Sequence, residues 1–214
     1  MRLIETMDDI AAAIARLVEA EPRFGPLVDA NGLPPLRRAP GGFAGLAAII
    51  VEQQISLHAA AAILARLKDA VTPLEPTRLL AAGDEVLATC GLSRAKIAAL
   101  TALARDVAEG RLDLDSLAGL DDETAAARLA GVRGIGPWTT DIYLLSCLGR
   151  ADVWPAGDVA LQTAAGLVLG LAPRPDRRHM LALAEPWRPW RAVAARLLWS
   201  HYRALRFRIP PPGA

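Results

Sequence analysis

Apolar residues recur at helical spacing along almost the whole chain, and runs of alternating Val, Ile, Thr and Tyr are missing. The first pattern is typical of amphipathic helices, whereas the second would predict strands. We therefore expect an all-α fold. Helices are predicted over residues 7–20, 43–53, 56–71, 77–82, 84–90, 93–109, 121–130, 137–149, 158–169, 177–185 and 189–206, followed by an extended tail, RIPPPGA.

Four segments rich in glycine and proline interrupt these helices: GLPPLRRAPGG at 32–42, GVRGIGP at 131–137, VWPAG at 153–157 and APRPD at 172–176. The first and the third divide the chain. We expect a central helical lobe over 43–150 and a second lobe in which residues 1–42, a helix and a linker, pack with a C-terminal helical set, 151–214. Helix N-caps are expected at Asp8 or Asp9, Ser93, Asp121 and Asp158.

The composition suits a protein of the reducing cytoplasm. With 214 residues, 53% of them hydrophobic, the chain can bury a sizeable core without disulfides. Its two cysteines, Cys90 and Cys147, are too few for a four-cysteine zinc or iron–sulfur site. No uncharged run reaches the length of a membrane span, and acidic residues interrupt the N-terminal stretch that a signal peptide would need.

The net charge of +1 predicts no strong overall attraction to nucleic acid, but the charge is unevenly distributed. From Trp187 onward there are six arginines and no acidic residue. A GC-rich, alanine-rich coding style explains this bias better than a binding role does, although a binding role stays open. Only two lysines, Lys68 and Lys96, are available for any mechanism that needs an amine nucleophile.

The segment GVRGIGPWTT places three glycines and a proline between two predicted helices. Gly131, Gly134 and Gly136 permit close approach of the backbone, and Pro137 suits the first turn of a helix. A helix N-terminus beside glycine amides binds anions such as phosphate. On these residues alone, an ordinary tight turn is an equally good interpretation.

Four blocks of sequence resemble one family in the same order. LAGVRGIGPWTTDI is similar to the helix-hairpin-helix signature of base-excision DNA glycosylases, with the motif over about 121–149. IIVEQQISLHAAAAILARL, DVWPAGDVAL and WRPWRAVAARLLW resemble further segments of its 3-methyladenine DNA glycosylase II branch. The resemblance implies a two-lobed fold with the active site in the interlobe cleft, in a compact form without the N-terminal β domain of some members.

The resemblance places the catalytic carboxylate at Asp158, in PAGDVALQ. Cleavage of an N-glycosidic bond generates an oxocarbenium-like sugar, which a nearby carboxylate stabilises while water completes the displacement. Alkylated purines carry positive charge and leave without much help from a general acid. A plain helix N-cap is the alternative interpretation of this aspartate.

A base must leave the duplex before an enzyme can reach it, and an aromatic pocket then receives it. Trp138 and Trp199 match aromatic positions of the family pocket, although each could instead be a core tryptophan. Two positions depart from the family, because Ile142 and Val159 stand where members can carry pocket tyrosines.

The remaining site residues also come from the resemblance. The family inserts a wedge side chain into the duplex at the turn EQQIS, which points to Gln54 with Gln53 beside it. Hairpin contacts to the DNA backbone are expected from Gly131, Gly134, Gly136 and Thr139. No cofactor and no catalytic metal are implied, but the carbonyls of Ala130, Val132 and Ile135 could hold a structural Na⁺ or K⁺.

Relatives that also nick the DNA backbone use a lysine in the helix after the hairpin, and Trp138 occupies that position here. We therefore expect a monofunctional glycosylase that acts as a monomer on duplex DNA containing alkylated purines. The alternatives are a glycosylase for oxidised or deaminated bases, a non-enzymatic helix-hairpin-helix DNA-binding module, and an all-α interaction protein.

Overall fold

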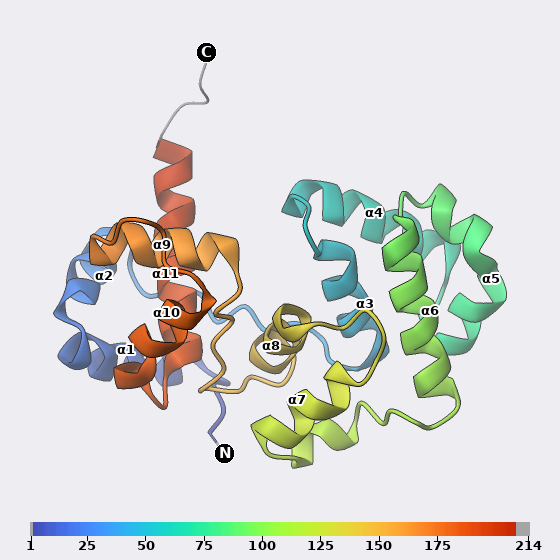
Figure 1. Ribbon diagram of the computed structural model, residues 1–214, viewed down its shortest axis with the longest axis horizontal. Helices are drawn as coiled ribbons and strands as arrows, with labels where there is room; N and C mark the ends of the chain where they lie inside the picture. The colour runs from blue at the N-terminus through green and yellow to red at the C-terminus, as the bar shows by residue number, and fades with distance from the viewer. Residues whose placement is uncertain (1, 209–214) are drawn as a thin grey trace. The chain divides into compact units, whose positions relative to one another are not determined.

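The computed structural model describes residues 2–208, and the side chains of 2–206. Over this range the chain is helical, and its only β feature is an isolated antiparallel bridge between Leu3 and Arg150 (Figure 1). The predicted all-α class is confirmed. No helix of the described range is long and apolar enough to cross a membrane. Most of the tail that was expected to be extended lies outside the described residues.

The chain forms two compact units. The terminal unit contains Met1–Arg38 and Gly149–Ala214, and the central unit contains Ala39–Leu148. Both boundaries lie a few residues before those expected from the glycine- and proline-rich segments. The physical cause is local, because Ala39 already donates its N–H to the carbonyl of Ser146 within the central unit.

The terminal unit is built around its last helix, α11 (Arg191–Arg208), against which α1, α2 and α9 pack (Figure 1). Phe24 and Trp154 flank the buried ring of Trp187, with ring centroids 5.0 Å and 5.4 Å away. The other elements are α1 (Met7–Ala20), η1 (Pro22–Phe24), α2 (Gly25–Asn31), α9 (Val159–Leu169), α10 (Arg177–Leu183) and η3 (Glu185–Trp187).

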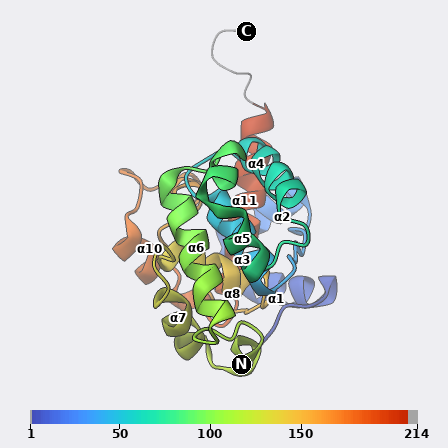
Figure 2. The ribbon, with the colours of Figure 1, turned by 90° about the vertical axis from the view of Figure 1, so that its right-hand side faces the viewer.

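In the central unit, the apolar helix α3 (Gly42–Glu52) packs against α6 (Arg94–Ala108) and α8 (Pro137–Ser146). Helices α5 (Pro76–Thr89) and α6 run side by side (Figure 2). The unit is completed by α4 (Leu57–Ala70), η2 (Ser116–Gly119) and α7 (Asp122–Ala130).

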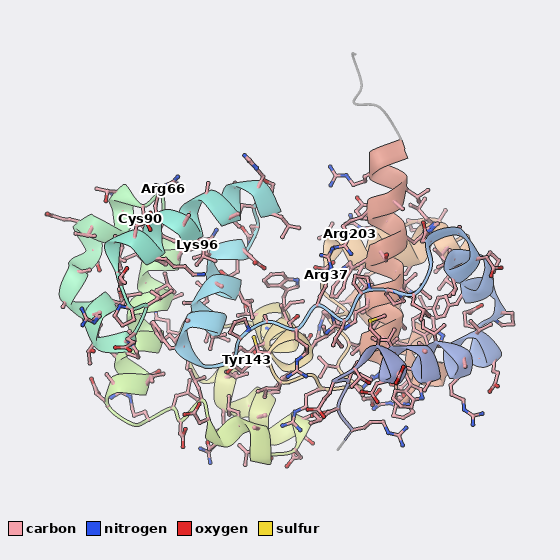
Figure 3. All side chains as sticks on the ribbon, turned by 180° about the vertical axis from the view of Figure 1, so that it is seen from behind. Arg37, Arg66, Cys90, Lys96, Tyr143 and Arg203 are labelled. Carbon is pink, nitrogen blue, oxygen red and sulfur yellow. The ribbon has the colours of Figure 1, made fainter. Side chains whose placement is uncertain are left out.

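Tyr143 fixes α8 against the beginning of α3. Its ring is fully buried, and its hydroxyl accepts a 3.0 Å hydrogen bond from the N–H of Gly42 (Figure 3). Burial raises the pKa of Tyr143 to about 12. The helix that follows the hairpin is therefore held rigidly by the core of its own unit.

Two helix predictions need correction. Residues 77–82 and 84–90 were expected to be separate helices, but α5 runs through both with a kink at Gly83, whose φ of +76° only glycine adopts easily. Helix α2 was not predicted, because Gly25 and Pro26 interrupt the pattern; proline is tolerated in the first turn, and buried Leu27 anchors the helix.

The expected N-caps are present at Ser93, Asp121 and Asp158, whose side chains each accept a backbone N–H. At the first helix the prediction was wrong by two or three residues. Thr6 is the N-cap, and Asp9 completes a capping box by accepting the Thr6 N–H.

Candidate functional site

The hairpin joins α7 to α8 through residues 131–136. The buried side chains of Val132 and Ile135, each 4% exposed, anchor it to the central unit. Gly136 is the N-cap of α8 and Pro137 its first residue. The first amides of a helix have no partner within that helix, so the beginning of α8 presents donors suited to an anion.

The three hairpin glycines have different structural surroundings. Gly134 has a φ of +88°, and a Cβ built on it would lie 2.5 Å from the Cβ of Ala99 on α6. Gly134 is therefore required by packing inside the protein. A Cβ on Gly136 would meet no protein atom within 4 Å, so this position is open on its outer side. Gly131 is exposed, at the C-cap of α7.

The structure restricts how Thr139 could contact the DNA backbone. Its side chain is only 2% exposed, and its hydroxyl accepts a 2.8 Å hydrogen bond from the side-chain amide of Gln53. The hydroxyl is therefore used inside the protein. Only the backbone N–H of Thr139, in the first turn of α8, remains a candidate for binding DNA.

The turn of residues 53–56, which we name the wedge turn after the role expected of Gln54, connects α3 to α4. Gln54 is exposed and has a φ of +58°, a conformation that is uncommon for a residue other than glycine. Ser56 accepts the N–H of Ala59 and caps α4. Because the Gln53 side chain is bound to the hairpin, Gln54 alone remains the proposed wedge residue.

In the terminal unit, Asp158 and Trp199 are brought together although they are far apart in the sequence. Oδ1 of Asp158 accepts hydrogen bonds from the N–H of Leu161 at 2.7 Å and from Nε1 of Trp199 at 3.0 Å. Both side chains are half-buried. The interpretations as N-cap and as functional carboxylate are therefore compatible, because one oxygen caps α9 while the indole orients the group.

The segment before Asp158 is firmly held. Trp154 is buried and donates its indole N–H to the carbonyl of Met180 at 2.9 Å. Gln162, one turn into α9, donates its amide to the carbonyl of Ala156 at 2.9 Å. The Asp158 carboxylate is therefore presented on a rigid backbone, as a preorganised site requires.

Most of the described C-terminal arginines are engaged within the terminal unit. Arg188 and Arg191 both form ion pairs with Asp152 and with Glu185. Arg196 is 5% exposed and donates to the carbonyl of Arg37, and burial together with Arg37 and Arg38 lowers its pKa to about 10. These three arginines are engaged within the protein. Fewer arginines of this segment are therefore available to bind DNA than the sequence suggests.

Residues 47–189 match the family described as HhH-GPD superfamily base excision DNA repair proteins. The chain belongs to this family. A DNA-3-methyladenine glycosylase 1 from Schizosaccharomyces pombe is 30% identical over 155 residues, which are 71% of this chain and 68% of that protein.

Two solved HhH-GPD structures share the fold. The crystal structure of a DNA-3-methyladenine glycosidase from Bacillus halodurans aligns with a TM-score of 0.78 and 31% identity, covering 97% of this chain and 95% of that one. The 3-methyladenine DNA glycosylase of S. pombe, in complex with abasic DNA, aligns with a TM-score of 0.83 and 27% identity, covering 88% and 95%. Curated relatives from Bacillus subtilis and Mycobacterium tuberculosis are matched over only 33% and 21% of their own lengths.

The HhH-GPD hairpin is also where a monovalent cation was expected. Backbone carbonyls are a suitable donor set, and Ala130 stands at the C-terminal end of α7, where the helix dipole favours a cation. The Val132 carbonyl already accepts the N–H of Ile135 at 3.1 Å and offers only its second lone pair. Among the described residues, no group of three or more His, Cys, Asp or Glu side chains could hold a metal.

The lysines differ in their surroundings. Lys68 is exposed in the last turn of α4. Lys96, on α6, is 8% exposed and donates from Nζ to the carbonyl of Val51 at 2.8 Å, and burial lowers its pKa (Figure 3). Lys96 is remote from the hairpin in sequence, but its helix packs against Gly134 one turn further along.

Trp138 is half-buried in the first turn of α8, in the central unit. Ile142, one turn later, is half-buried, whereas Val159 is 58% exposed beside Asp158. An exposed valine next to the carboxylate is consistent with a surface that a ligand covers. The participation of Trp138 in a base pocket stays a prediction.

Proposed function

We propose that this protein is a DNA glycosylase of base-excision repair that removes alkylated purines, of the 3-methyladenine and 7-methylguanine type, from duplex DNA. The observation that carries the proposal is the Asp158 carboxylate, which caps α9 and accepts a hydrogen bond from the Trp199 indole, in a chain of the HhH-GPD family. The names of its relatives support the substrate class.

The Asp158 carboxylate supplies a negative charge, and the reaction develops positive charge on the sugar. The bond between C1′ of the sugar and the base nitrogen breaks, and the base leaves with the electron pair. The sugar becomes oxocarbenium-like, and the carboxylate stabilises it. A water oxygen then adds to C1′, and its proton passes to solvent.

An alkylated purine suits this arrangement because its ring already carries positive charge, so it departs without a strong general acid. An electron-poor base also stacks well on indole, through an interaction related to the cation–π effect. Trp199 would then have two functions, since its N–H orients Asp158 and its ring face receives the base. Trp138 is proposed as a second aromatic surface.

We propose that the protein has no lyase activity. Trp138 occupies the family position at which a lyase carries its lysine, Lys68 is exposed on α4, and the Lys96 amine is bound to a backbone carbonyl. Schiff-base formation needs a free amine at C1′.

The amides at the beginning of α8 and the hairpin glycines Gly131, Gly134 and Gly136 are proposed to hold a DNA phosphate, and Gln54 to fill the space left by the flipped nucleotide. Contacts to the phosphate do not depend on the base sequence, so they serve any duplex.

We propose that the protein acts as a monomer in the cytoplasm, where its DNA substrate lies.

Base release from methylated genomic DNA, resolved by chromatography, tests the proposal. Wild-type protein should release methylated purines and leave intact abasic strands that break only on alkaline treatment. Asp158→Asn keeps a good N-cap, yet should lower release by roughly a hundredfold or more because one transition-state charge is lost.

The matched control is Asp176→Asn. Asp176 caps α10 of the same unit and accepts the N–H of His179, so this variant changes an N-cap carboxylate outside the proposed site. It should release bases normally. If Asp158→Asn turns over like the wild type, Asp158 has no part in the reaction; strand breakage without alkali would refute the absence of lyase activity.

A further inference from the structure

The wedge turn is held from both sides inside the central unit. On one side, the Lys96 ammonium on α6 binds the carbonyl of Val51, near the end of α3. That carbonyl belongs to the last turn of the helix, where it lacks a helical partner. A donor at this place fixes the end of α3, immediately before the turn begins.

On the other side, Gln53 connects the turn to the hairpin. Its Nε2 donates to Oγ1 of Thr139 at 2.8 Å and lies 3.4 Å from the carbonyl of Gly134. The first contact is a good hydrogen bond and the second a long one. Thr139 is 2% exposed and belongs to the first turn of α8, so its hydroxyl is a fixed acceptor.

The hairpin is in turn fixed to α6, because Gly134 lies where even a methyl group would meet Ala99 at 2.5 Å. Lys96 is one turn before Ala99 on the same helix. Helix α6, the hairpin and the wedge turn are therefore connected in a closed loop of contacts, in which the Gln53 side chain bridges the turn and the hairpin directly.

We propose that Gln53 is a positioning residue that couples the hairpin to the wedge. Its hydrogen bond to Thr139 fixes the distance between the phosphate-binding amides and Gln54, so the hairpin's hold on the DNA determines where Gln54 enters the duplex. The inference rests on the proposed function, in which a nucleotide is flipped out of the stack.

The physical reason is preorganisation. A wedge side chain on a mobile turn must become ordered when it enters the duplex. Ordering a side chain with many rotamers costs free energy at that step. A turn already bonded to the phosphate-binding element has been ordered during folding. The expected gain is in base flipping, while binding to an undamaged duplex changes little.

The test uses a duplex in which 2-aminopurine, a fluorescent adenine analogue that brightens when unstacked, occupies the position to be flipped. Gln53→Ala and Thr139→Val each remove the same neutral hydrogen bond. Each should lower the fluorescence-reported flipping constant by roughly two- to tenfold. Affinity for an unmodified duplex should stay within about twofold, because the hairpin amides are unchanged.

Three controls separate coupling from damage to the fold. Thr139→Ser keeps the hydroxyl and should flip like the wild type. The double variant Gln53→Ala with Thr139→Val should be no worse than either single variant, because one bond is removed twice. Gln54→Ala should cost less in the Gln53→Ala background than in the wild type, and melting temperatures check that each variant is folded.

Other patterns overturn the inference. A defect in Gln53→Ala with normal Thr139→Val would mean that Gln53 contacts the DNA itself, and losses that multiply in the double variant would mean two independent roles. No base release enters this assay. A chain that shows the expected coupling but releases no alkylpurine would therefore retain the positioning role and lose the proposed activity, whereas a wild type that releases alkylpurines but leaves the probe stacked would overturn the positioning role alone.

Discussion

Two glycines of the hairpin, two residues apart, are expected to respond to the same substitution in opposite ways. A Cβ on Gly134 would lie 2.5 Å from the Cβ of Ala99, and the backbone there has a φ of +88°. A Cβ on Gly136 would meet nothing within 4 Å, and its φ of −93° is allowed for any residue. Alanine at each position therefore separates packing from DNA binding.

The magnitudes follow from these geometries. At Gly134, the left-handed conformation costs a residue with a Cβ about 1–2 kcal/mol, and overpacking against Ala99 costs about 1–3 kcal/mol more. Gly134→Ala should thus lose roughly 2–5 kcal/mol of unfolding free energy, which is much of a typical domain's stability. Gly136→Ala should stay within about 1 kcal/mol, since a poorer N-cap is offset by a less flexible unfolded chain.

DNA binding should show the reverse preference. A methyl group at Gly136 stands where a phosphate would approach the amides, and losing a hydrogen bond to a charged group costs about 1.5–3 kcal/mol. Affinity should fall roughly ten- to hundredfold, equally for lesion-bearing and unmodified duplexes. Urea unfolding and fluorescence anisotropy with both duplexes give the two quantities for each variant.

Ala99→Gly supplies an internal check, because in the Gly134→Ala background it removes the clash and should restore the overpacking part of the loss. Three results would contradict the roles assigned to these glycines: equal stability of the two alanine variants, no rescue by Ala99→Gly, or a loss of affinity at Gly136 confined to damaged DNA.

Two further predictions concern the two units separately. Trp199→Phe keeps an aromatic face but loses the N–H that binds Asp158, and should slow single-turnover base release at least about tenfold, since hydrogen bonds to charged groups contribute about 1.5–3 kcal/mol; Trp199→Ala should lose a further 1–3 kcal/mol or so of stacking. Normal release by Trp199→Phe, with an unchanged melting temperature, would contradict the orienting role. In the central unit, burial raises the pKa of Glu52 above 4.5, so ionisation destabilises the folded state progressively as pH rises past that value. Glu52→Gln should therefore be more stable than wild type at pH 7 and equal to it below about pH 4; a gain that is the same at both pH values would show that the charge is not the cause.

Much of the secondary structure could be read from local patterns, because helical periodicity and N-cap chemistry act within a few residues. Ser93, Asp121 and Asp158 are examples of caps that local chemistry alone predicted. The failures are also physical. Helix α2 depends on the burial of Leu27. Whether Gly83 ends the helix or only kinks it depends on the packing of α5 against α6.

Helical periodicity was enough to predict the all-α class and most of the helices, and the four motif blocks pointed to the HhH-GPD family. It also brought out Asp158, Trp199 and the hairpin glycines as candidates, since each stands in a recognisable local pattern.

The contacts that these side chains make become visible only in the folded chain. The bond from Trp199 to Asp158 spans 41 residues, that from Gln53 to Thr139 spans 86, and that from Lys96 to Val51 spans 45. No local pattern encodes such pairs, because they exist only once helices far apart in the chain have packed. For this reason the sequence did not reveal that the Thr139 side chain, expected at the DNA contact, is buried, or that the Gln53 side chain is hydrogen-bonded to it.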